Sequence, residues 1–201
     1  MSDTYLQIVA TQITEIKVKG SRFIGEALLV YDEAEASSAL QAVRKRAYNA
    51  THHCSAYRLG QDGGLQRYSD DGEPNGTAGQ PILRQIDGRS LTNLLVVVTR
   101  YYGGTKLGTG GLSRAYGDAA GAVLDLCKIK QHIIREHVKI KFAYADTSPA
   151  MHTIDSFDVK IESSNYGDDT ELIVAVRKSD VAGFLAQFKE SLSGRGTATI
   201  V

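Results

Sequence analysis

The chain has 201 residues, and 42% of them are hydrophobic, enough to bury the core of one large domain or two small ones. Its 23 basic residues balance its 23 acidic residues, which argues against a protein held to nucleic acid chiefly by bulk charge. Two cysteines are too few for a disulfide scaffold, and no apolar run approaches the roughly 20 residues of a membrane span. We expect a cytoplasmic protein with reduced thiols, no signal peptide and no membrane partner.

The first part of the chain alternates strand and helix patterns. Residues 5–10 and 15–31 are β-rich, and a Gly-Ser turn at 20–21 interrupts the second stretch. Asp32 is placed to cap a helix that ends in the basic triplet 44–46. Two further strands are predicted at residues 53–59 and 94–102. Two further helices are predicted to begin near Thr77 and Thr109. The strand at 94–102 is apolar on both faces, which is typical of a central strand.

The pattern changes after a short, polar stretch at 127–132, where we place a domain boundary. Residues 138–144 alternate as a half-buried strand, and Ser148-Pro149 begins a helix. Two strands flanking a turn, a second helix and a final strand complete the order βαββαβ, the ferredoxin-like motif. The sequence therefore predicts an α+β protein with domains at residues 1–131 and 132–201.

The segment SDDGEPNGTAG, residues 69–79, brings three carboxylates together in Asp70, Asp71 and Glu73. Such a group can hold Mg²⁺ or supply acid–base chemistry. Asp-Gly and Pro-Asn-Gly are also turn sequences, and Asn75 or Thr77 can cap the helix that follows. A capped turn, a polar binding site and a metal site stay open at this point, and no metal or cofactor is assigned.

The segment RYYGGTKLGTGGLSRAY, residues 100–116, is neither a Walker A loop nor a dinucleotide-binding fingerprint, because its Lys and Ser stand in the wrong places. A strand nevertheless ends near Arg100, glycines follow, and a helix begins with free N–H groups near Thr109, Gly110 and Gly111. Lys106 and Arg114 flank this helix end, an arrangement suited to an anion. The alternative is a flexible turn with close helix packing at Gly117 and Gly121.

Three segments, HHCSAYR, SDDGEPNGTAGQPIL and VVVTRYYGGTKLGTGGLSRAY, occur in this order within residues 52–116. Together they closely resemble the IMPACT family. The resemblance implies an N-terminal domain with the two-layer α/β fold of ribosomal protein S5 domain 2. The C-terminal unit is similar to the last domain of elongation factor G, which agrees with the βαββαβ pattern.

The resemblance also implies a link to translation. Eukaryotic members act through a partner protein that controls an initiation-factor kinase, but that activity uses a separate domain to which the resemblance does not extend. What carries over is the polar surface of the shared domain, and the resemblance supplies no catalytic residue. The candidate binding residues are Asp70, Asp71, Glu73, Thr77, Arg100, Lys106, Thr109, Gly110, Gly111 and Arg114.

We expect a translation-associated binding protein, not an enzyme, that contacts RNA, the ribosome or a translation factor. Its cations and N–H groups would meet phosphates, with Tyr101, Tyr102 or Tyr116 available for stacking. The alternative is an enzyme or small-ligand binder acting on a nucleotide or phosphorylated metabolite, with Mg²⁺ held by residues 70–73. A third interpretation is a protein adaptor that uses the exposed sheet of the C-terminal domain. The sequence favours no particular oligomeric state.

Overall fold

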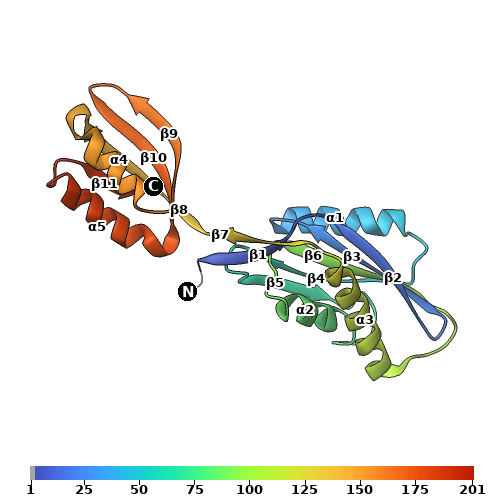
Figure 1. Cartoon of the computed structure of the whole chain (residues 1–201). Coiled ribbons are helices and arrows are strands. Elements are labelled where there is room, and N and C mark those ends of the chain that lie inside the picture. The colour runs from blue at the N-terminus through green and yellow to red at the C-terminus, as the bar shows by residue number, and fades with distance from the viewer. Residues whose placement is uncertain (1–2) are drawn as a thin grey trace. The chain divides into compact units, whose positions relative to one another are not determined.

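The computed structural model describes residues 3–201 and divides the chain into two compact units (Figure 1). The first unit holds residues 5–132, and the second holds residues 3–4 with 133–201. Five α-helices and several antiparallel sheets make up the described chain, so the α+β class predicted from the sequence is confirmed. In this part of the chain no helix is long and apolar enough to cross a membrane.

The first unit is built on a five-stranded antiparallel sheet in the order β2-β3-β6-β4-β5. Its strands are β2 (Gln12–Val18), β3 (Ser21–Leu29), β4 (His52–Leu59), β5 (Leu65–Ser69) and β6 (Leu94–Tyr101). Its helices are α1 (Glu33–Arg46), α2 (Gly79–Asp87) and α3 (Gly108–Asp125). As the sequence predicts, β6 is central and nearly all of its residues are buried.

Helices cover both faces of this sheet, as Figure 1 shows. Helices α2 and α3 pack on one face over a core that includes Phe23, Val98 and Tyr116. Helix α1 packs Ala36 and Val43 on the opposite face, against alternate residues of β4 and β6. The unit therefore has three layers, and the expectation of a two-layer arrangement is wrong. The extra layer is α1, whose apolar stripe requires cover from the second face of the sheet.

The second unit has the order βαββαβ that its sequence predicts. Its elements are β8 (Arg135–Ala143), α4 (Thr147–Asp155), β9 (Val159–Tyr166), β10 (Asp169–Arg177), α5 (Val181–Ser191) and β11 (Thr197–Ile200). The antiparallel sheet order is β11-β8-β10-β9, consistent with a ferredoxin-like domain. Helices α4 and α5 share one apolar core with the sheet, in which Phe142, Phe184 and Phe188 pack together.

Two strands lie outside the two larger sheets. Strand β1 (Thr4–Ile8) pairs with β7 (Ile129–Ile133) in a separate two-stranded sheet. The sequence predicts β1 but neither β7 nor β5, because both missed strands are largely exposed and polar. Their pairing depends on neighbouring strands, and an exposed strand carries no burial pattern to reveal it.

Candidate functional site

The three segments that carry the resemblance meet at the end of the sheet where β6 ends. His52 at the start of β4 lies opposite Arg100 at the end of β6. Arg100 donates a hydrogen bond to Glu73 Oε1 at 2.5 Å, and the Tyr116 hydroxyl of α3 donates to the same oxygen at 2.8 Å. Residues from all three segments thus form one connected group.

Asp70 fixes the conformation of the loop at residues 70–79. Its two carboxylate oxygens accept hydrogen bonds from the backbone N–H groups of Gly76, Ala78 and Gly79, at 2.8–2.9 Å. Helix α2 is therefore capped by a carboxylate from the preceding loop and not by Asn75 or Thr77. The Thr77 hydroxyl instead donates to the Pro74 carbonyl at 2.6 Å. A distant carboxylate replaces the local cap because the loop folds back over the helix N-terminus.

Asp71 ties this loop to β4 and to α1. One carboxylate oxygen accepts from the Arg44 guanidinium at 2.5 Å, and the other accepts from the backbone N–H of His53 at 2.6 Å. The backbone carbonyl of Asp71 lies 2.8 Å from His52 Nδ1. Asp71 itself has a φ of 47° and is followed by Gly72 at 88°, a left-handed pair that turns the loop sharply.

Glu73 and Arg100 form a buried ion pair, with side chains only 5% and 6% exposed. The Arg100 guanidinium lies over the rings of Phe23 and Tyr102, at 5.5 and 5.4 Å from their centroids. Arg100 Nε is buried and has no hydrogen-bond partner within residues 3–201. Removal of one member of a pair this deeply buried is costly, because it leaves the other charge buried and unpaired.

Cys54 is fully buried beside this group and donates from Sγ to the Asp70 carbonyl at 3.0 Å. Burial, together with the nearby negative charge of Glu73, raises the pKa of the Cys54 thiol to about 12. Burial also raises the pKa of the Tyr116 hydroxyl. A thiol that stays protonated at neutral pH is a poor nucleophile, so Cys54 has a packing role here.

The candidate residues therefore separate into two groups. Asp70, Asp71, Glu73, Thr77 and Arg100, with Cys54 and Tyr116, form what we call the buried polar cluster, whose polar atoms mostly bond to one another or to nearby backbone. Lys106, Thr109, Gly110, Gly111 and Arg114 lie apart from it at the start of α3 and form what we call the glycine-rich surface. Tyr116 is fully buried and is not available for stacking, contrary to expectation.

The glycine-rich surface combines an open helix end with two cations. No side chain of the described chain caps α3, and Gly108 at its start has a φ of 72°. Helical side chains tilt toward the N-terminus, so Arg114 reaches back over the positions of Gly110 and Gly111. A Cβ on Gly110 would meet nothing within 4 Å, which leaves the backbone there uncovered. Neither Lys106 nor Arg114 forms an ion pair within residues 3–201.

The close packing predicted at Gly117 and Gly121 is also present. Gln85 of α2 lies against both positions, with its side chain 3.2 Å from where a Cβ on Gly121 would stand. The packing interpretation is therefore confirmed for the later glycines of α3, whereas anion binding at the early ones stays a prediction. The early glycines leave the helix end open, and the later ones bring α2 close.

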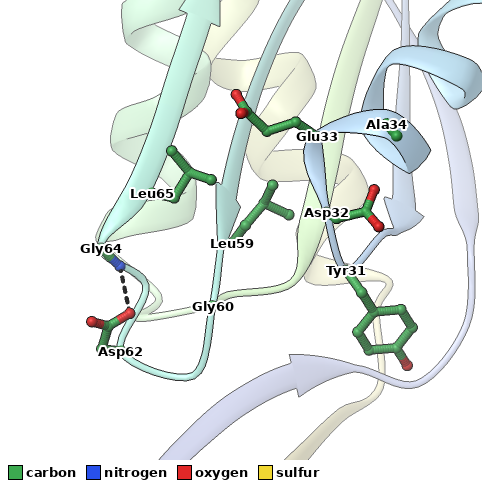
Figure 2. Close-up of a pocket in the computed structure, with 9 residues that line it drawn as sticks. All are labelled: Tyr31, Asp32, Glu33, Ala34, Leu59, Gly60, Asp62, Gly64 and Leu65. Carbon is green, nitrogen blue, oxygen red and sulfur yellow. Dashed lines mark hydrogen bonds between the residues drawn. The ribbon is translucent and has the colours of Figure 1, made fainter.

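A separate pocket of about 680 Å³ lies at the opposite end of the sheet, next to the N-terminus of α1 (Figure 2). It is lined by the carboxylates of Asp32, Glu33 and Asp62 and by Tyr31, Leu59 and Leu65. Asp32 caps α1, and Asp62 accepts from the Gly64 N–H at 3.0 Å. The length of β6 separates this pocket from the glycine-rich surface by roughly 25 Å.

Comparisons with known proteins agree with the resemblance seen in the sequence. Residues 19–124 match the model of the Impact N-terminal domain, and residues 140–195 match a domain of unknown function (DUF1949). The chain is 35% identical to the Escherichia coli IMPACT family member YigZ, over 93% of each chain. A Saccharomyces cerevisiae protein IMPACT homolog is 33% identical over 45% of this chain and 36% of its own length. A crystal structure titled as a hypothetical protein superposes with a TM-score of 0.70 at 30% identity, covering 100% of this chain and 98% of the other. The chain belongs to the IMPACT family.

Proposed function

We propose that this chain is a translation-associated regulatory protein that contacts RNA, the ribosome or a translation factor through the glycine-rich surface. It acts by binding and not by catalysis. The translation link follows from the IMPACT family, to which both bacterial and eukaryotic relatives belong. The proposal extends to the folds: a first unit related to ribosomal protein S5 domain 2 and a second related to the last domain of elongation factor G. Both folds recur in ribosome-bound proteins, which is support by analogy.

The observation that carries the proposal is the open end of α3. Its first N–H groups point out of a segment that is largely exposed, and the positive end of the helix dipole favours a negative partner there. Lys106 and Arg114 add two charges that form no ion pair with a carboxylate in the described residues 3–201. A phosphate group or a carboxylate of a partner satisfies both features at once.

The alternative of an enzyme with Mg²⁺ held by residues 70–73 finds no support in this geometry. Asp70 already accepts three backbone N–H groups, and Asp71 is bonded to Arg44 and β4. Glu73 is paired with Arg100 beneath the surface. A metal would have to compete with these contacts for each carboxylate.

Ribosome co-sedimentation tests the proposal. The wild type is compared with a Lys106→Ala/Arg114→Ala variant at low and physiological salt. We expect the wild type to sediment with ribosomes, more strongly at low salt, and the double variant to stay in the supernatant. Arg100 is left intact because its substitution would disturb the buried polar cluster.

The matched control is Lys160→Ala/Lys189→Ala, which removes the same charge from exposed positions of the second unit. We expect this control to sediment like the wild type. If both double variants lose binding equally, the interaction depends on net charge and not on the glycine-rich surface. If the wild type remains in the supernatant at both salts, the translation proposal is wrong.

A further inference from the structure

The turn between β2 and β3 touches the start of the glycine-rich segment through bare backbone. A Cβ on Gly103 would lie 1.9 Å from the carbonyl carbon of Gly20 and 2.3 Å from the nitrogen of Ser21, so both glycines are needed for this approach. The Gly103 N–H also donates to Ser21 Oγ at 3.1 Å. Figure 1 shows the β2–β3 turn beside the segment that joins β6 to α3. Two regions far apart in the sequence thus meet at this contact.

This surface is basic in a chain whose net charge is zero. The turn carries Lys19, and Lys106 follows Gly103 within three residues, which span at most about 11 Å. Lys17 and Arg22 pair on the opposite face of the sheet, where Arg22 holds Glu15 in a two-point contact at 2.7 and 3.1 Å. The side chains of Lys19 and Lys106 form no ion pair within residues 3–201.

An aromatic ring is fixed next to the contact between Gly20 and Gly103. Tyr102 directly precedes Gly103 and is 48% exposed. Its ring lies over the Arg100 guanidinium at 5.4 Å, and its backbone N–H donates to Thr51 Oγ1 at 3.0 Å. Arg100 is itself held by Glu73. The buried polar cluster therefore positions a half-exposed ring at the surface before any ligand arrives.

We propose that this surface binds single-stranded RNA, with one base stacked on Tyr102 and the neighbouring phosphates at Lys19 and Lys106. The inference rests on the proposed function and specifies single-stranded RNA as the ligand of this protein. A pre-positioned ring flanked by cations is what a single strand requires, because its bases are free to stack and its phosphates follow the backbone. The bases of an A-form duplex are already stacked inside the helix, and an acidic peptide gains nothing from the ring.

Fluorescence anisotropy with a labelled oligouridylate of about ten nucleotides tests the inference on the full chain. We expect Tyr102→Ala to weaken binding roughly tenfold, whereas Tyr102→Phe, which keeps the ring, binds nearly as the wild type does. The matched control is Tyr144→Ala, which removes an exposed tyrosine from the second unit and leaves binding unchanged. Thermal unfolding of each variant checks that it is folded.

The salt dependence of binding gives a second measurement that does not depend on the Tyr102 variants. Each phosphate contact on a single strand contributes about 0.7 to the slope of log K against log salt. Substitution of Lys19 or Lys106 by Gln should therefore lower the slope by about 0.7 each. Lys45→Gln, an exposed lysine of α1, is the charge-matched control with an unchanged slope.

Several results would overturn the inference while leaving the proposed function intact. One is ribosome co-sedimentation that needs Lys106 and Arg114, combined with no binding of the oligonucleotide. Another is RNA binding that Tyr102→Ala and the two lysine variants leave unchanged. A third is equal binding of a labelled oligoglutamate peptide, unaffected by Tyr102→Ala, which would favour an acidic protein partner. Absence of both ribosome and RNA binding would remove the proposed function together with the inference.

Discussion

Replacement of Arg100 by Met tests whether the buried polar cluster holds the first unit together. Methionine has a similar length and no charge, so the change removes the guanidinium while filling much of its space. Glu73 would be left as a carboxylate that is 5% exposed, with the Tyr116 hydroxyl as its remaining close donor. The stack between Phe23 and Tyr102 would lose its central cation.

The expected cost is about 3–5 kcal/mol of unfolding free energy, the range for breaking a buried ion pair from one side. Two smaller effects modify it. Loss of the cation contacts to two rings adds about 1 kcal/mol. Removal of the unpartnered, buried Arg100 Nε offsets part of the cost, by about 1–3 kcal/mol. The net expectation is therefore a loss of about 3 kcal/mol.

The matched control is Arg22→Met. Arg22 also pairs with a glutamate at 2.7 Å and also lies over a tyrosine ring, but its side chain is 48% exposed. Exposed pairs of this kind contribute only about 0–1 kcal/mol. The two effects are compared by the urea concentration at which Cys54, fully buried in the same unit, becomes open to alkylation. Equal midpoints for the two variants would refute the structural role of the Glu73–Arg100 pair.

Four further predictions concern the same unit. Because burial raises the pKa of Cys54 from 9.0 to about 12, the unfolded thiol loses its proton first, and stability should fall as pH rises from about 9 to 12; urea unfolding of Cys54→Ala should show a weaker decline. Gly103→Ala should cost about 1–3 kcal/mol because its methyl group meets the backbone of Gly20, whereas Gly110→Ala, in open helix, should add about 0.5–1 kcal/mol; similar urea midpoints would contradict this. Asp70→Ala should lower stability by at least about 1–2 kcal/mol in thermal unfolding, because three N–H groups lose their acceptor; no change would show that water replaces it. Deletion of residues 132–201 should leave a first unit that still unfolds cooperatively in calorimetry, since it has its own core; loss of the transition would contradict the domain boundary.

The secondary structure was largely predictable because apolar periodicity marks elements that bury one face. The helices, the central strand β6 and the whole βαββαβ order of the second unit follow from such patterns. Strands β5 and β7 do not, since their side chains are mostly exposed and their partners come from elsewhere in the chain. The sequence did contain an indication of the third layer, which is helix α1. A strand as apolar as β6 has to be covered on both of its faces.

The sequence suggests candidate site residues but does not show how they divide between the buried polar cluster and the glycine-rich surface. Sequence spacing places Asp70, Asp71 and Glu73 together without showing that their oxygens face backbone N–H groups and arginines. Burial of Arg100 depends on Phe23 and Tyr102 meeting from different parts of the chain. Such facts come from tertiary packing, which one sequence does not display.

The contribution of the β2–β3 turn was missed for a related reason. Lys19 looks like an ordinary exposed charge of a hairpin. The available signal was a glycine at each contact position, because glycine next to a strand often marks close approach of another backbone. Only the structure pairs Gly20 with Gly103 across more than eighty residues of sequence, as the hydrogen bond from Gly103 to Ser21 records.

Site-specific photo-crosslinking tests most directly whether the glycine-rich surface contacts the translation machinery. A benzophenone side chain is placed at Lys106 or, as the control, at Ser38, which is exposed on α1 across the sheet from α3. Each protein is irradiated in a ribosome-containing cell extract, and the products are identified. We predict crosslinks from position 106 to ribosomal RNA, a ribosomal protein or a translation factor, and none of these from position 38. Crosslinks from both positions alike, or from neither, would contradict the account.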